Sequence, residues 1–218
     1  MIKPEFRFGA VILAAGASTR MGEPKQLLSL QGHPLITRTV ETALESAAWP
    51  IVVVLGAHAE MIRPLLARYP VLVAENPAWI EGMASSIRTG ISMLQQFSRH
   101  LDGALVALCD QPAFNPATIA QLISAQRETG RTIAAARYRG RNGAPALFLR
   151  EHFAALTTLT GEEGARSLLN ADPSRVSSVE LPALAIDLDT PADYNAFRNL
   201  GTGSSYSDKS ASGPEPTS

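Results

Sequence analysis

The stretch of sequence that decides the fold is Phe8-Gly9-Ala10-Val11-Ile12-Leu13-Ala14-Ala15-Gly16-Ala17-Ser18-Thr19-Arg20-Met21-Gly22-Glu23-Pro24-Lys25. Its first eight residues form an apolar run that predicts a buried strand, and the small residues that follow predict a loop. Small residues let a backbone wrap closely around a ligand, and consecutive free N–H groups bind anions. Arg20 and Lys25 add positive charge, so we expect this loop to hold phosphate groups.

Glycine spacing excludes two commoner phosphate-binding loops. Gly16 and Gly22 stand six residues apart with no glycine between them, and Gly22 is followed by Glu-Pro-Lys. The first fact excludes the dinucleotide fingerprint Gly-x-Gly-x-x-Gly, and the second excludes a P-loop. An ordinary Gly/Ser turn remains the alternative. Lysine occurs only at positions 3, 25 and 209, so Lys25 is either an exposed residue or a site that needs a compact ammonium group.

Apolar runs alternate with helical periodicity along the chain. Strands are predicted at residues 8–15, 50–56, 71–74, 103–108, 132–138, 146–149 and 176–181, and helices at residues 34–47, 59–68, 83–96, from 115, 151–156, 163–169 and 190–199. This order predicts one three-layer α/β/α domain over residues 1–200, with a mostly parallel sheet. Ligands of such sheets bind beyond the carboxyl ends of the strands, here after Ala15, Gly56 and Cys109. The Gly/Ser/Thr/Pro-rich residues 201–218 are predicted to be a disordered tail.

Composition narrows the classes of partner. The formal net charge is -1 and there is no basic run, so we expect no nucleic-acid partner. The apolar run at residues 10–15 is too short to span a membrane. The N-terminus carries charges and no long apolar stretch, which argues against a signal peptide. A single cysteine, Cys109, excludes an internal disulfide and fits a reducing cytoplasm, where we expect the protein to reside.

Three carboxylates are candidates for holding a metal ion. Asp110 follows a predicted buried strand, where it is well placed to bind Mg²⁺ between phosphates; the alternative is that it caps a turn. Asp187 and Asp189 stand two residues apart. If Asp187 ends a strand, both reach one edge of the site; otherwise Asp189 starts the last helix and Asp187 is solvated.

The second half of the chain adds ligand-binding candidates. Gly82 precedes a predicted helix whose first turn holds Ser85 and Ser86, so free N–H groups and hydroxyls face a ligand there unless this is an ordinary helix start. Arg166 stands in the predicted helix at residues 163–169, where by itself it indicates only a cation on the helix surface.

These motifs resemble a known family. Leu-Ala-Ala-Gly-x-Ser-x-Arg-Met-Gly-x-Pro-Lys is similar to the signature of nucleotidyltransferases that have a Rossmann-like fold of the GT-A type. Within that superfamily it most resembles the molybdenum cofactor cytidylyltransferases of the MobA-like NTP transferase family. Cys109-Asp110-Gln111-Pro112 and Asp187-Leu188-Asp189-Thr190-Pro191 extend the resemblance to nearly Leu200. Two positions depart from the pattern: Ala144 stands where members often have His, and Glu162 where Asp is usual.

The resemblance implies a role for each candidate residue. It implies catalysis by Arg20, Lys25 and Asp110, with Mg²⁺ held by Asp110 and Asp187, and acceptor binding by Arg166 and Asp189. The nucleotide contacts it implies are Leu13, Ala14, Ala15, Gly16, Ser18, Gly22, Lys25, Gly82, Ser85, Ser86 and Asp110. Ala15 favours cytidine, because the guanylyl-transferring relatives usually have Gly there.

The implied activity is transfer of CMP from CTP to the terminal phosphate of molybdenum-bearing molybdopterin, with release of pyrophosphate. Its partners would be the nucleoside triphosphate, the pterin and client molybdoenzymes. Two alternatives remain open. One is an enzyme of the same fold that uses GTP or a sugar or polyol phosphate, and the other is a non-catalytic chaperone for the cofactor.

Overall fold

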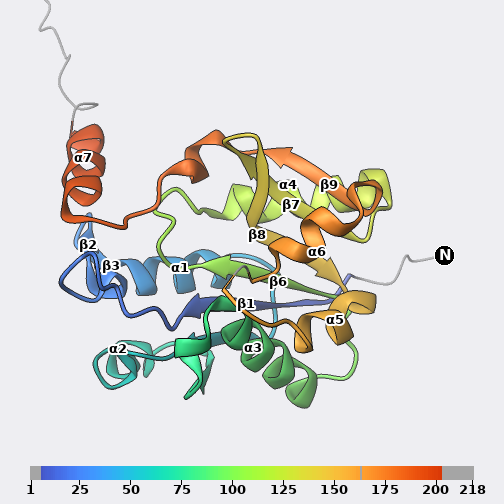
Figure 1. The fold of residues 1–218 in the computed structure, drawn as a ribbon, viewed down its shortest axis with the longest axis horizontal. Coiled ribbons are helices and arrows are strands. Elements are labelled where there is room, and N and C mark those ends of the chain that lie inside the picture. The colour runs from blue at the N-terminus through green and yellow to red at the C-terminus, as the bar shows by residue number, and fades with distance from the viewer. Residues whose placement is uncertain (1–5, 163, 203–218) are drawn as a thin grey trace, which may run out of the picture.

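The first apolar run forms β1 (Phe8–Ala14), which is buried along its whole length. A computed structural model describes residues 6–162 and 164–202, and in this part of the chain β1 lies inside a seven-stranded sheet (Figure 1). The strand order is β5 (Leu72–Glu75), β4 (Ile51–Leu55), β1, β6 (Gly103–Leu108), β8 (Arg141–Leu149), β7 (Ile133–Tyr138), β9 (Val176–Glu180). Among these strands β8 alone is antiparallel to its neighbours, which confirms the predicted α/β domain with a mostly parallel sheet.

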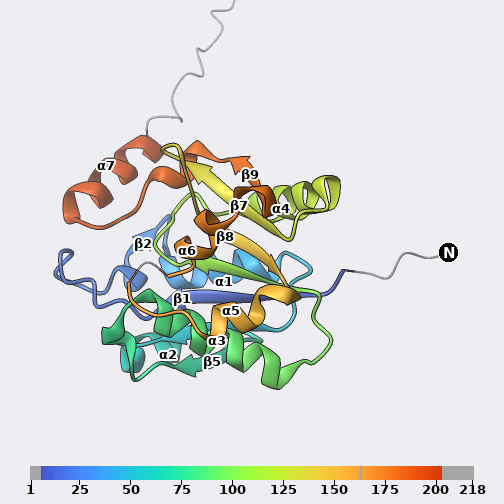
Figure 2. The ribbon, with the colours of Figure 1, turned by 45° about the vertical axis from the view of Figure 1, so that its right-hand side comes forward.

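Helices cover both faces of the sheet, because the strands bury side chains on both. In β1, Ala10 and Ile12 point to one core, and Val11 and Leu13 to the other. The first core is closed by α1 (Leu35–Leu44), α2 (Ala59–Leu66) and α4 (Pro116–Thr129), and the second by α3 (Met83–Phe97), α5 (Phe153–Thr157) and α6 (Arg166–Ala171). Figures 1 and 2 show α3, α5 and α6 in front of the sheet and α1 and α4 behind it, which gives the three layers expected.

Local sequence explains where α4 begins and ends. The Asn115 side chain accepts a hydrogen bond from the Thr118 N–H, and Pro116 takes the first helical position, as predicted. The helix ends at Gly130, whose φ of 64° is left-handed. The remaining short elements are η1 (Lys25–Leu27), η2 (Trp79–Glu81), η3 (Arg150–His152), η4 (Pro173–Arg175) and η5 (Pro182–Ala185).

Several predicted boundaries differ from the structure, and three of these differences change how neighbouring elements are connected or where the domain ends. Pro34 lies in β3 (His33–Pro34), which pairs with β2 (Ser29–Leu30), so α1 begins one residue later than predicted. Strand β8 begins at Arg141 rather than at residue 146, because a tight turn joins it directly to β7. Helix α7 (Pro191–Thr202) passes the predicted domain boundary at residue 200, and residues 203–218 of the predicted tail lie outside the described residues.

The carboxyl ends of β1 and β6 face the segment that follows η5. Leu188 is fully buried against Met21, Leu28, Leu30 and Leu35, so this late segment packs on the loop after β1. No helix in residues 6–162 or 164–202 has the length and apolar character that crossing a membrane requires.

Candidate active site

The loop after β1 is held in shape by its own polar groups. Ser18 has a left-handed φ of 54°, and its Oγ accepts a hydrogen bond of 3.0 Å from the Lys25 N–H. The buried Gln26 amide donates to the carbonyl oxygens of Ala14 at 3.0 Å and Gly16 at 2.9 Å. Sequence reasoning did not identify Gln26, since a glutamine beside an exposed loop gives no sign that its amide is buried.

The loop after β4 supports the first loop from the side. His58 Nε2 lies 2.9 Å from the Ala17 carbonyl oxygen, and the Ala57 N–H donates to the Ala15 carbonyl at 3.1 Å. A Cβ on Gly56 would lie 2.6 Å from that same Ala15 oxygen, so only glycine allows this approach. The loop predicted to bind ligand after Gly56 therefore positions the first loop.

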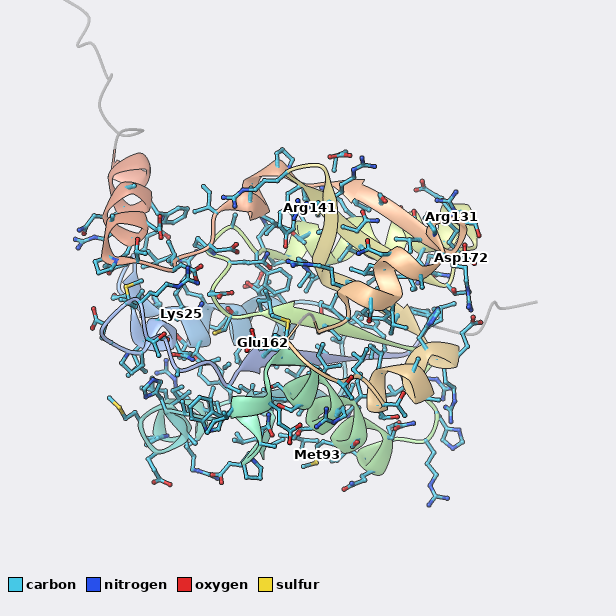
Figure 3. All side chains as sticks on the ribbon, in the orientation of Figure 1. Lys25, Met93, Arg131, Arg141, Glu162 and Asp172 are labelled. Carbon is cyan, nitrogen blue, oxygen red and sulfur yellow. The ribbon has the colours of Figure 1, made fainter. Side chains whose placement is uncertain are left out.

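A cavity of about 710 Å³ opens at this edge of the sheet. It brings together most of the predicted residues, from the first loop, the start of α3 and the end of β6. Its lining includes Leu13, Ala14, Ala15, Gly16, Arg20, Lys25, Gly82, Ser86 and Asp110, together with Ala17, Gln26, Trp79, Ile80, Met83, Leu108, Cys109 and Glu162. Figure 3 shows Lys25 and Glu162 at this edge of the sheet.

Three predicted nucleotide contacts lie outside the cavity lining: Ser18, Gly22 and Ser85. Ser85 is buried; its hydroxyl accepts from the Asn76 amide at 2.8 Å and lies 2.8 Å from the Gly82 carbonyl oxygen, to which it donates. Gly22 has a φ of 81°, which lets the chain turn toward Lys25. The structure places these three residues as supports of the cavity wall.

Two cations that line the cavity, Arg20 and Lys25, form a network with two carboxylates, of which Asp110 also lines the cavity and Asp189 does not. The Lys25 ammonium pairs with Asp110 and lies 3.2 Å from Asp189 Oδ1, while Arg20 Nη2 lies 2.9 Å from Asp189 Oδ2. Burial by itself lowers the pKa of Lys25, but the charges of Asp110 and Asp189 outweigh burial and raise that pKa. The ammonium is therefore charged at neutral pH. Asp189, predicted on the acceptor side, pairs with both cations.

Asp110 has an oxygen that suits a metal ion. Its Oδ2 faces Lys25, whereas its buried Oδ1 has no hydrogen-bond partner among the described residues. A buried carboxylate oxygen is costly unless a donor or cation meets it, and hard divalent cations prefer oxygen ligands.

Asp187 approaches Asp110 without the strand that would have placed it there. It follows η5, so the premise that Asp187 ends a strand is wrong; the Leu188 N–H donates to the Asp110 carbonyl at 3.3 Å and holds the segment in place. Burial, with the charges of Asp110 and Asp189, raises the pKa of Asp187 to about 6. The described residues contain no cluster of three acidic, histidine or cysteine ligands. A cation here would complete its shell with phosphate and water, as Mg²⁺ commonly does.

A second, smaller cavity of about 240 Å³ adjoins the first. It shares Leu13, Met83, Leu108 and Glu162 with the first cavity, and Arg166 lies in the wall of the second cavity rather than in that of the first. The buried Gln111 amide, also missed by sequence reasoning, donates to Tyr138 Oη at 3.1 Å and the Ala144 carbonyl at 3.0 Å. These two hydrogen bonds hold the cavity wall at Ala144, the position where the family often has His.

A cation-bearing loop and a carboxylate at the carboxyl ends of parallel strands define an α/β protein built to bind a nucleotide with its phosphates. Residues 10–176 match the family model described as the MobA-like NTP transferase domain. The chain belongs to this family of nucleotidyltransferases.

The chain is also similar over most of its length to individual proteins and to solved structures. The chain is 33% identical over 180 residues to nicotine blue oxidoreductase of Paenarthrobacter nicotinovorans, covering 78% of this chain and 85% of that protein. It is 29% identical over 207 residues to the purine catabolism protein PucB of Bacillus subtilis strain 168, covering 86% and 94%. The manganese complex of Rv0371c from Mycobacterium tuberculosis H37Rv is 27% identical, with a TM-score of 0.71 over 88% of this chain and 98% of that one.

Proposed function

We propose that this chain is a Mg²⁺-dependent nucleotidyltransferase that moves CMP from CTP to the terminal phosphate of molybdenum-bearing molybdopterin and releases pyrophosphate. One observation carries the proposal: Arg20, Lys25 and Asp110 converge in a single cavity, and one Asp110 oxygen is free to bind a cation. The fold similarity to a manganese-bound relative supports a divalent ion at this site.

The reaction follows from the charges in the cavity. An oxygen of the acceptor phosphate attacks the α-phosphorus of the nucleotide, the bond to the bridging oxygen breaks, and pyrophosphate leaves with the electron pair. Lys25 and Arg20 stabilise the negative charge that grows on the departing phosphates. A phosphate nucleophile is already ionised, so the residues need only position it in line. A cation bound by Asp110 and Asp187 would neutralise further phosphate charge.

Two features support nucleotidyl transfer from CTP over other reactions. Ala15 stands where the guanylyl-transferring relatives usually have glycine, which favours cytidine. One relative is named an oxidoreductase, but the first loop of this chain has two cations and lacks the Gly-x-Gly-x-x-Gly spacing of a dinucleotide site. The loop chemistry therefore favours phosphate displacement over hydride transfer.

The test is a panel of nucleotides. Pyrophosphate release is measured with CTP, GTP, ATP and UTP, with and without the pterin, first with Mg²⁺ and then with EDTA. Release that needs both CTP and the pterin and stops in EDTA supports the proposal. Equal release with GTP, or with a sugar or polyol phosphate in place of the pterin, supports the rival enzymes.

A chaperone is separated from an enzyme by one variant. If Asp110→Ala still supports insertion of the cofactor into a molybdoenzyme in cells, catalysis at this site is not the function. We expect Asp110→Ala to abolish both pyrophosphate release and cofactor insertion.

A further inference from the structure

A third cavity, of about 380 Å³, lies beside the second and has a strongly cationic wall. Its lining is Arg137, Gly140, Arg141, Asn142, Arg166 and Asn170. The arginines come from three elements: Arg137 lies near the end of β7, Arg141 begins β8 after the turn that joins the two strands, and Arg166 begins α6. Figure 3 shows Arg141 near that turn, above Glu162.

The positive charge of this cavity is only partly balanced. Arg137 Nε lies 3.2 Å from Glu180 Oε1, whereas neither Arg141 nor Arg166 has a carboxylate within ion-pair distance in residues 6–162 and 164–202. Planar guanidinium groups match the oxygens of phosphate and carboxylate groups, and charge-assisted bonds of this kind are the strong ones.

The three cavities adjoin one another in series. Leu13 and Leu108 line both the second cavity and the first, which we name the nucleotide cavity because the proposed function places the nucleotide there. Arg166 lines both the second cavity and the third. The second cavity has mostly apolar walls, including Phe148 and Leu169. A molecule that reacts in the nucleotide cavity can therefore lay an apolar body in the second cavity and extend a polar end into the third.

We propose that the third cavity is a second oxyanion site, which binds a phosphate-like group of the acceptor remote from its attacking phosphate. The acceptor is then a molecule with two anionic groups joined by an apolar or planar body. In molybdenum-bearing molybdopterin, which has a single phosphate, the second group is the set of oxygens on the molybdenum. That the molecule bound in the third cavity is the acceptor rests on the proposed function, whereas binding of an oxyanion in that cavity does not. Two experiments separate the two claims.

The first experiment needs no acceptor and uses inorganic phosphate as the probe. The nucleotide cavity of the full chain is filled with Mg²⁺ and a non-hydrolysable α,β-methylene analogue of CTP, and phosphate is titrated while arginine Nε–H resonances are followed by NMR. We expect saturable shifts, with a Kd raised about 10-fold in Arg141→Gln because one charge-assisted bond is lost. Arg99→Gln, an equal charge change at an exposed residue outside all three cavities, should leave the Kd unchanged. Absence of saturation, or equal Kd values in Arg141→Gln and wild type, overturns the site.

The second experiment measures the acceptor directly. With the acceptor that the nucleotide panel identifies, Arg141→Gln should raise the acceptor KM about 10-fold and leave the KM for CTP unchanged. A rise in the KM for CTP of the same size would overturn the assignment to the acceptor. If wild-type protein forms no product with any acceptor, the proposed function fails, and the phosphate titration still decides whether the oxyanion site exists.

Discussion

At the scale of single residues, the surroundings of Lys25 favour a lysine over an arginine. Its side chain is 16% exposed and its ammonium fits between Asp110 and Asp189, which stand on segments distant in sequence. A compact ammonium can meet two carboxylates and then turn to phosphate, whereas a guanidinium is larger, planar and rigid.

We therefore expect Lys25→Arg to lower kcat/KM about 100-fold, equivalent to ~2.7 kcal/mol of transition-state stabilisation. The measurement is pyrophosphate release under the conditions of the nucleotide panel. Arg20→Lys is the matched exchange; because the Arg20 side chain is 72% exposed, it should cost about 10-fold or less. Activity of Lys25→Arg within about threefold of wild type would contradict the need for a compact cation.

Asp187 gives a prediction about pH. Its pKa rises from 3.8 to about 6 through burial and the charges of Asp110 and Asp189. Between these two values the folded chain binds more protons than the unfolded chain, so the free energy of unfolding falls as the pH rises. Asp187→Asn removes this penalty, and we expect it to increase the free energy of unfolding above about pH 6 and to flatten the curve below it.

Urea denaturation of the ligand-free protein from about pH 4 to about pH 8 measures this effect. Asp172→Asn is the control of opposite sign, because hydrogen bonds from Ser174 lower the pKa of Asp172 and stabilise its ionised form. The control should lower stability at neutral pH. Parallel curves of unfolding free energy against pH for Asp187→Asn and wild type would show that the folded protein does not disfavour the ionised form of Asp187.

The site could be predicted only where chemistry and local motif coincide. Arg20, Lys25 and Asp110 stand in motifs, and the structure brings all three to one cavity. Gln26 and the pairing of Asp189 with the cations were not foreseen. A buried amide gives no pattern in the sequence, and the contact between Lys25 and Asp189 joins residues 164 positions apart.

At the scale of elements, the start of α3 depends on Gly82. Its backbone has φ 101° and ψ −172°, a region that only glycine adopts readily. A Cβ there would lie 2.8 Å from the Glu162 Cα, so the helix start and the segment before α6 meet at this glycine. Both segments line the nucleotide cavity.

We expect Gly82→Ala to destabilise the protein by about 2–3 kcal/mol and to raise the Kd for CTP with Mg²⁺, because the two cavity walls must move apart. Gly130→Ala is the control: Gly130 also has a positive φ, but a Cβ there meets nothing within 4 Å. It should cost about 1 kcal/mol and leave the Kd unchanged. Denaturation of both variants measures the loss of stability, and calorimetric titration measures the Kd for CTP with Mg²⁺. A change in Kd of equal size in both variants would show that Gly82 contributes through its backbone conformation alone and not through its contact with Glu162.

Elements were predictable where burial is continuous. The apolar runs of β1, β4 and β6 lie where the sequence placed them, since buried parallel strands need no polar face. The first half of β8 was missed, because its residues from Arg141 to Ala144 are not fully buried and carry no apolar run. Its pairing with β7 comes from the tight turn at Arg139 and Gly140, both with positive φ, which an arginine does not signal.

At the scale of the whole molecule, the end of the described chain completes the site formed by its beginning. Residues 186–197 pack over the first loop: Leu188 contacts the cluster that contains Met21, and Tyr194 Oη donates to the Ser29 carbonyl at 2.6 Å. This cluster is separate from the two cores on the faces of the sheet. We therefore expect the order of the first loop to depend on contacts that the sheet does not supply.

This separation predicts a difference between two buried leucines. Leu188 and Leu184 are both buried, but Leu188 lies in the cluster between the first loop and residues 186–197, and Leu184 lies in a core of the sheet. Each Leu→Ala change should lower the free energy of unfolding by about 2–5 kcal/mol, the usual cost of a cavity. Leu188→Ala should in addition raise the Kd for CTP with Mg²⁺ about 10-fold, because a loosened loop must be ordered when the nucleotide binds.

Calorimetric titration at a temperature where both variants are folded measures the two Kd values. Leu184→Ala should bind CTP as wild type does, since the first loop keeps its own cluster. A rise in Kd of equal size in both variants would mean that binding follows global stability alone. No rise in Leu188→Ala would mean that the first loop is ordered without the late segment, and that its hydrogen bonds to Ser18 and Gln26 are sufficient to hold it.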